Sequence, residues 1–286
     1  MFDTTLIPAQ VITLAALVAV FSVMFSLGLA SRAGDLRWAI SRPGLVARAL
    51  FTVLVIVPAV AVLVTRALGL PRAVQVGLVL MAVCPGAPVA LRRSLDAGGH
   101  HSFATALQLL MAILAIVTMP LSITLLNPLY GGHAGISPGE IAQQVFTVQL
   151  LPLGLGLLVR RLVPVAATRA VPGVTKAAGV MLAAFAVLLI VAIWKAVLAA
   201  APATIVAIIV ITLVALALGH ALGAPAADTR TAVAMASAIR NPGLALLVAA
   251  ANSAAPEMVA TVMQCALWSA LTVTPYAVWR AKGARK

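Results

Sequence analysis

The sequence predicts an all-α protein that crosses a lipid bilayer about nine times. Hydrophobic residues make up 63% of the 286 residues and charged residues only 9%, whereas a soluble domain carries about 25% charged residues. The mean hydropathy is +1.15. Apolar stretches follow one another at lengths near the roughly 20 residues that a helix needs to cross the hydrocarbon core. They lack the alternation of lipid-facing strands, so we expect helices and not a β-barrel.

Apolar runs between short charged segments define the predicted spans. The first run follows a leading segment that holds Asp3 and no basic residue, and it is too long for the apolar region of a signal peptide. We therefore expect it to remain as a membrane span. The later runs follow it after short breaks that hold most of the charged residues. The predicted spans are residues 10–29, 44–66, 72–95, 101–126, 140–161, 174–199, 203–223, 228–251 and 256–279.

The basic residues predict the orientation of the chain. One side of the membrane would hold fifteen of the nineteen basic residues, and the other only Arg66, Arg72 and Lys195, while Arg240 lies within a span. Because basic flanks are normally cytoplasmic, we expect a multi-pass protein of the cell membrane with its N-terminus outside and its C-terminus inside. The net charge of +13 is explained by this topology, and no nucleic acid partner is expected. The fifteen residues are Arg32, Arg37, Arg42, Arg48, Arg92, Arg93, Arg160, Arg161, Arg169, Lys176, Arg230, Arg280, Lys282, Arg285 and Lys286.

A weak internal repeat relates the two halves of the chain. The sequence R-A-L-G-L-P at residues 66–71 is similar to H-A-L-G-A-P at residues 220–225, and a Pro-Gly interruption lies in the span that follows each copy. These third and eighth spans are five crossings apart, so the copies face opposite ways, as in the inverted repeats of many secondary transporters. The repeat predicts a single membrane domain over residues 1–286, with four spans in residues 1–130 and five in residues 138–286.

The two Pro-Gly interruptions, C-P-G from Cys84 and N-P-G from Asn241, predict broken helices. Proline removes a backbone donor and glycine relaxes the chain, so each pair should unwind its helix near mid-membrane. A simple proline kink is the alternative for either one. Lipid cannot satisfy unwound backbone, so the matched pair favours a binding site built where the breaks meet. We expect residues 85–88 to lie close to residues 240–243.

Several motifs together resemble the bile acid:sodium symporter (BASS) family, and the resemblance runs over nearly the whole chain. Their order and spacing are more specific than any one of them. They are F-S-L-G-L at residues 25–29, Pro43, the V-P that ends at Pro58, C-P-G at residues 84–86, Pro120, N-x-G-L-A at residues 241–245, and Trp268.

The resemblance implies a fold and an activity. The family has ten spans in two inverted repeats, with a core domain in which two broken helices cross and a panel domain that packs against it. This chain would begin at the family's second span, which agrees with a first repeat of four spans. A substrate, usually a small organic anion, would bind between the two domains near the crossing. We therefore expect a secondary transporter that works by alternating access.

The resemblance also assigns the positions of sodium ligands, and here the chain departs from the family. Hard cations such as sodium need oxygen ligands. Of the matching side chains only that of Gln108 offers one, so sodium coupling is doubtful, and no other metal or cofactor is expected. The matching positions are Val53, Ala90, Leu91, Ala104, Gln108, Ala236 and Arg240.

Arg240 is the most unusual residue of the sequence. A charge at mid-membrane costs about 2.5 to 3.5 kcal/mol on insertion scales. The six acidic residues all lie at span ends or in loops, so none is an obvious partner. Three interpretations stay open. The guanidinium donates to carbonyls at half-helix C-termini as a tethered cation, it binds an anionic substrate bidentately, or it snorkels to water without a specific role.

The candidate binding residues are Pro85, Gly86, Ala87, Pro88, Gln108, Arg240, Asn241, Pro242 and Gly243. Capping of the broken helix is an alternative role for Asn241, and interhelical hydrogen bonding is one for Gln108. A non-transporting membrane sensor with the same fold is the alternative function. An enzyme is disfavoured because the sequence shows no paired carboxylates, no metal-spaced His/Cys set and no nucleophile–base pair.

Overall fold

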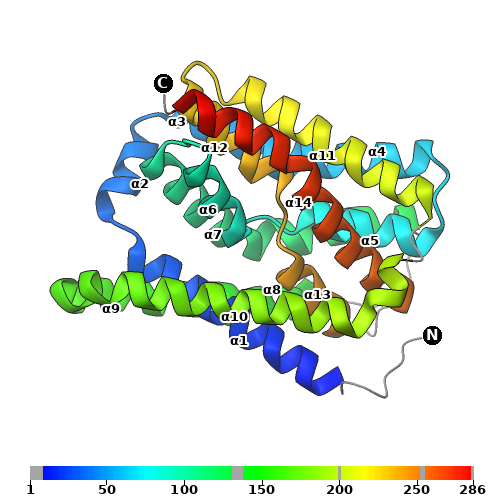
Figure 1. Cartoon of the computed structure of the whole chain (residues 1–286), viewed down its shortest axis with the longest axis horizontal. Helices are drawn as coiled ribbons and strands as arrows, with labels where there is room; N and C mark the ends of the chain where they lie inside the picture. Colours follow the sequence, from blue (N-terminus) through cyan, green and yellow to red (C-terminus); the bar gives the residue numbers. More distant parts are fainter. Residues whose placement is uncertain (1–8, 131–137, 199–200, 252–254, 285–286) are drawn as a thin grey trace.

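The computed structural model describes residues 9–130, 138–198, 201–251 and 255–284, and within these ranges it contains helices and no strand. The predicted all-α fold is confirmed (Figure 1). The helices are α1 (Ala9–Ala30), α2 (Ala33–Ile40), α3 (Pro43–Phe51), α4 (Val57–Ala67), α5 (Arg72–Val83), α6 (Pro88–Asp96), α7 (His101–Leu126), α8 (Pro138–Val145), α9 (Leu151–Leu162), α10 (Pro164–Leu198), α11 (Pro202–Leu222), α12 (Ala227–Ala238), α13 (Pro242–Ala251) and α14 (Pro256–Ala284). The π-helical turns η1 (Thr52–Ile56) and η3 (Phe146–Leu150) join α3 to α4 and α8 to α9, and the 3-10 turn η2 (Asn127–Tyr130) follows α7.

The helices account for the predicted membrane spans. In the described part of the chain, seven stretches are long and apolar enough to cross a bilayer, and two bent helix pairs raise the number to nine. The bent pairs are Leu14–Ala30 with Gly34–Ile40, at 83°, and Arg72–Val83 with Pro88–Asp96, at 64°. Each of the nine predicted spans overlaps one of these stretches, and the third and eighth are broken as expected.

Two segments predicted to lie between spans are helical in the structure. Residues 33–40 form α2, where the Arg32 backbone N–H donates to Asp35 Oδ2 at 3.0 Å. Helix α10 begins at Pro164, ten residues before the predicted sixth span. Both segments contain charged residues, so hydropathy places them outside the membrane. Hydropathy does not report whether such a segment is helical. In α10, the proline at the first position and the alanines at 166 and 167 favour a helix.

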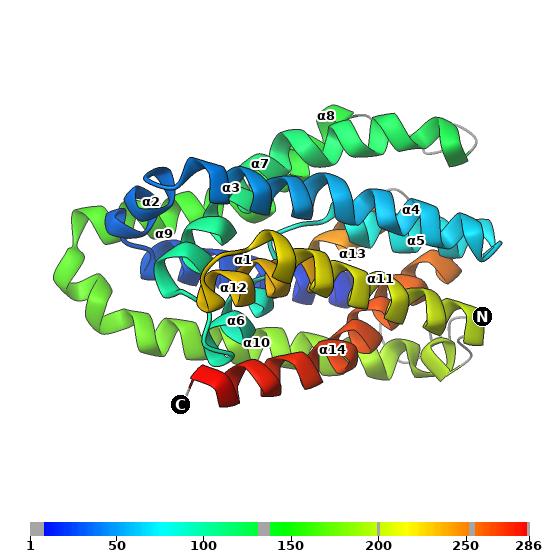
Figure 2. The same ribbon diagram turned by 90° about the horizontal axis from the view of Figure 1, so that it is seen from above.

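The helices form two layers, which we call the panel and the core. The panel consists of α1, α10 and the span from α8 through η3 to α9, and α1 lies along both α9 and α10 (Figure 1). The core consists of α3 to α7 and α11 to α14, and its two broken spans are α5 with α6 and α12 with α13 (Figure 2). This arrangement agrees with the core and panel that the resemblance implies.

Two glycines set the distance between α1 and α9 in the panel. A Cβ atom added to Gly28 would lie 2.2 Å from Leu153 O, and one added to Gly156 would lie 2.3 Å from Phe25 O. Each contact is with backbone, which cannot move aside without separating the helices. The reciprocal glycine pair therefore permits a close approach of the kind that small residues provide between membrane helices.

We expect Gly156→Leu to lower the free energy of unfolding by about 1–3 kcal/mol, because the new side chain overpacks the α1–α9 contact. Gly154→Leu is the matched control, since nothing lies within 4 Å of the Cβ position at Gly154 on the same helix. Thermal unfolding of the purified protein in detergent measures both variants. Equal midpoints for the two variants would contradict the proposed role of the glycine pair.

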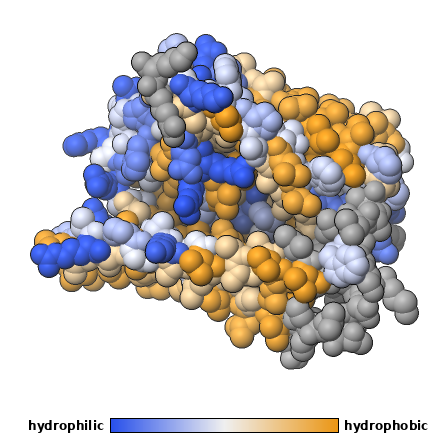
Figure 3. Space-filling view, in the orientation of Figure 1, coloured by the Kyte–Doolittle hydropathy of each residue, from blue (hydrophilic) through white to orange (hydrophobic). Residues whose placement is uncertain are grey.

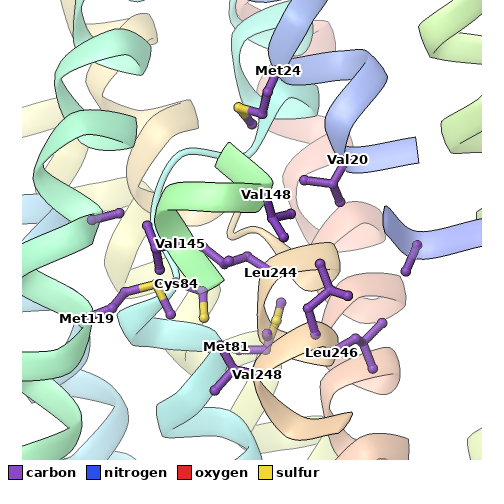
Figure 4. Close-up of a cluster of buried hydrophobic side chains, with 14 of the residues drawn as sticks. Val20, Met24, Met81, Cys84, Met119, Val145, Val148, Leu244, Leu246 and Val248 are labelled. Atoms are coloured by element: carbon purple, nitrogen blue, oxygen red, sulfur yellow. The ribbon is translucent and has the colours of Figure 1, made fainter. Parts of the chain in front are cut away.

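The largest apolar cluster joins the panel to the core at the helix breaks. Its buried members include Cys84 at the first break, Leu244 beside the second, and Val145 and Val148 of the panel (Figure 4). Methionines fill the space around them, among them Met119, which is fully buried. The panel thus seals the region where the two core helices are interrupted.

Candidate functional site

The two broken helices meet at their interruptions. The backbone N–H of Asn241, in the second break, donates to Cys84 O, in the first, at 3.1 Å. The expectation that the breaks lie together is therefore met by a direct backbone hydrogen bond. We call this region, residues 84–88 and 239–243, the crossing. Lipid could not supply this hydrogen bond, so a donor of the second unwound segment satisfies an acceptor of the first.

The sequence of each break explains why the helices end there. Helix α5 ends at Val83, and Gly86 follows with a φ of +77°, a left-handed conformation that favours glycine. Pro88 then occupies the first position of α6, where its missing N–H costs no hydrogen bond. In the second break Ile239 is extended and Pro242 begins α13 in the same way. A proline start after an unwound segment is thus shared by both breaks.

Three carbonyl groups in or just before the first break accept hydrogen bonds from different donors. Ala82 O, in the last turn of α5, accepts from Arg240 Nη2. Cys84 O accepts the Asn241 backbone N–H. Gly86 O accepts from Gln108 Nε2 at 2.5 Å and lies 3.5 Å from Asn241 Nδ2. Gln108 therefore acts as an interhelical hydrogen-bond partner between α7 and the first break.

Arg240 is buried at the crossing and does not snorkel. Its exposed fraction is 6%, and its Nη2 donates to Ala82 O and, at 2.7 Å, to Val53 O. Its Nε and Nη1 atoms have no hydrogen-bond partner among the described residues. The side chain thus ties the first break to η1 of the neighbouring span, with carbonyls as its ligands, and this geometry matches the tethered-cation interpretation.

The carbonyl of Val53 is available to Arg240 because of a nearby proline. In the π-helical turn η1 the Val57 N–H donates to Thr52 O, one residue further than in an α-helix. The N–H that would continue this pattern to Val53 O belongs to residue 58, which is a proline and has none. Because of Pro58, the buried carbonyl of Val53 is free to accept a hydrogen bond from the Arg240 guanidinium.

Asn241 and Gly243 fix the start of α13. The Asn241 Oδ1 atom accepts the Leu244 N–H at 3.1 Å, which is an N-terminal cap. A Cβ atom at Gly243 would lie 2.6 Å from Val20 Cγ2 of α1, so this glycine admits the panel close to the break. The capping role proposed for Asn241 is present, and both ends of its amide face the crossing.

Hydrophilic residues gather at one end of the molecule and line a hollow between the two layers there (Figure 3). Arg92 of α6 is exposed and reaches toward the panel, with its Nη1 atom 3.6 Å from the Cβ position of Gly179 on α10. Basic residues of the side predicted to be cytoplasmic thus border the gap between core and panel. The orientation of the chain in the membrane stays a prediction.

Comparison with known proteins decides the family. Residues 17–201, more than half of the chain, match the Sodium Bile acid symporter family. The chain belongs to this family. It is also 28% identical over 138 residues to an uncharacterised sodium-dependent transporter of Bacillus subtilis (strain 168), YocS, in a match that covers 48% of this chain and 42% of that protein. The chain is therefore a membrane protein of a transporter family.

Five of the seven sodium-ligand positions inferred from the bile acid symporter resemblance are apolar in the structure. Val53, Ala104 and Ala236 are buried together in one hydrophobic cluster, against which Leu91 also packs. Ala90 is buried in a neighbouring cluster. No side-chain oxygen is present at these five positions, and the Arg240 guanidinium lies against the backbone of Val53.

Gln149, which lies in η3 of the panel, was not among the residues predicted for the site. Its side chain is fully buried, and its Nε2 atom is 3.6 Å from the Cβ position of Gly86 at the crossing. The signal that could have revealed it is a single amide in the apolar run F-T-V-Q-L-L-P. The nine candidate residues all lie at or beside the crossing, and Gln149 adds a panel residue to them.

Proposed function

We propose that this protein is a secondary carrier that moves a small organic anion by alternating access and does not use sodium. The broken helices that cross within the core, the panel packed over them and the family membership support a carrier of this type. Solute would enter between panel and core, at the crossing, when the two layers separate. The nine candidate residues would then line or support the binding site.

The helix ends at the crossing favour an anion. Helices α6 and α13 both begin there, at Pro88 and Pro242, and helix N-termini carry partial positive charge. The buried charge of Arg240 has the same sign, and Arg92 borders the gap between the layers. These positive groups would attract a carboxylate and would repel a cation.

The hydrogen bonds of Arg240 support the proposal that this carrier does not use sodium. A guanidinium binds a carboxylate bidentately through Nη1 and Nη2 or through Nε and Nη2, so Nη2 takes part in either arrangement. Both hydrogens of Nη2 are committed to the carbonyls of Val53 and Ala82. The tethered-cation role is therefore favoured over bidentate substrate binding. In this role a permanent positive charge occupies the place where the resemblance puts sodium.

A carrier that does not use sodium differs from what the names of the family and of the Bacillus relative say. The family description includes sodium, and the name of the Bacillus relative says that it is sodium-dependent. The matched part of the family ends at residue 201, before the second break that holds Arg240. The departure rests on the residues of this chain, where five of the matching positions lack side-chain oxygen and a sixth is an arginine.

Uptake into proteoliposomes tests the proposal. We expect labelled small carboxylates to be taken up at rates that change less than about twofold when sodium is replaced by potassium or choline. Uptake that falls to background without sodium would contradict sodium independence. Binding of a carboxylate without net flux would favour a non-transporting sensor instead.

A further inference from the structure

Gln149 is a fully buried polar residue that takes no part in the hydrogen bonds of the crossing. Its exposed fraction is 0%, and neither Nε2 nor Oε1 has a hydrogen-bond partner in the described part of the chain. It belongs to the panel, and its Nε2 atom lies beside Gly86 of the core. Gln108 Nε2 and Gln149 Nε2 lie 3.5 Å and 3.6 Å from the same point, the Cβ position of Gly86.

An unpaired buried amide is unfavourable, since most buried polar groups in proteins have a partner. An apolar residue of similar size would fit the surroundings, because Val145 and Val148 of the same segment pack into the apolar cluster (Figure 4). The polar residue is therefore best explained by a state in which the panel and the core have separated and the amide meets a ligand.

We propose that Gln149 is a solute-binding residue of the panel whose amide hydrogen-bonds a hydroxyl group of the transported anion. This inference rests on the proposed carrier function. The unpaired Nε2 donates and the unpaired Oε1 accepts. A hydroxyl group does both, so it can satisfy a terminal amide that a carboxylate, an acceptor only, would leave half paired. The positive groups of the core would bind the carboxylate, and Gln149 of the panel would form hydrogen bonds with the hydroxyl group.

The test compares two pairs of anions that differ by hydroxyl groups, 3-hydroxybutyrate with butyrate and cholate with 5β-cholanate. Uptake into proteoliposomes is measured for wild type, Gln149→Leu and Gln143→Leu. Gln143 is the matched control because it is an exposed glutamine on α8 of the same span. We expect Gln149→Leu to raise KM for a hydroxylated anion about 3–10-fold, the value of one neutral hydrogen bond, and to leave that for the deoxy anion unchanged.

Thermal unfolding separates this role from a structural one. Gln149→Leu should unfold at the same or a higher temperature than wild type, since it removes an unpaired buried amide, whereas loss of a structural residue lowers the midpoint. Gln149→Met, unbranched and of similar length, repeats the test if the leucine variant does not fold. A hydroxyl preference that survives both substitutions overturns the inference and leaves the carrier proposal standing. A wild type that takes up none of the four anions overturns both.

Discussion

Replacing Arg240 by alanine is expected to abolish solute uptake and to lower stability. The substitution leaves the buried carbonyls of Val53 and Ala82 without their donor, at a cost of about 1–3 kcal/mol each. It also removes the positive charge that we propose to take the place of a coupling ion at the crossing. Arg240→Lys should recover only part of the uptake, because lysine keeps the charge but lacks the planar guanidinium that bridges two carbonyls.

Arg93→Ala is the matched control for this prediction. Arg93 also joins two helices through a carbonyl, with Nη1 donating to Ala270 O at 3.0 Å and to Thr274 Oγ1 at 3.2 Å, but it lies outside the crossing. We expect Arg93→Ala to lose stability and to keep measurable uptake. Uptake by Arg240→Ala that equals wild type, measured in proteoliposomes with matched protein content, would show that the charge at the crossing is not required.

The span pattern could be predicted from the sequence because lipid imposes one requirement on every crossing, a long continuous apolar run. The broken spans were also predictable, since proline and glycine act locally on the backbone. The start of α10 was not, because the charged segment from Pro164 lies outside the apolar run, where hydropathy no longer distinguishes helix from loop. Helix α2 was missed for the same reason.

The candidate site was predictable in its position and only partly in its bonds. The matched Pro-Gly pairs indicated that residues 85–88 and 240–243 would meet, and Arg240 stood out by its charge. The hydrogen-bond partners of Arg240 were not predictable. The free carbonyl of Val53 depends on a π-helical turn followed by Pro58, and the sequence does not indicate that turn. Gln149 was missed because its place opposite Gly86 comes from the packing of panel on core.

A second large effect is expected from restoring the oxygen ligands that the family resemblance assigns to sodium. The triple variant Val53→Gln, Ala236→Glu and Arg240→Gln should convert uptake from sodium-independent to sodium-dependent. Val53 and Ala236 lie in one buried cluster, and removal of the arginine vacates the space beside them. The carbonyls of Val53 and Ala82, freed from the guanidinium, would add two backbone oxygens to the three new side chains, and oxygen ligands are what a hard cation requires.

The measurement is uptake by the triple variant in sodium compared with choline, beside wild type. We expect at least about a tenfold fall in choline for the variant, which corresponds to roughly 1.4 kcal/mol of coupling, and less than about a twofold change for wild type. The matched control carries Ala236→Gln in place of Ala236→Glu, so that it keeps one side-chain oxygen there and lacks the negative charge. Its sodium response should be weaker because an uncharged site holds a cation less tightly. A folded triple variant that transports equally well in both salts would mean that the guanidinium of Arg240 does not stand in for a sodium ion.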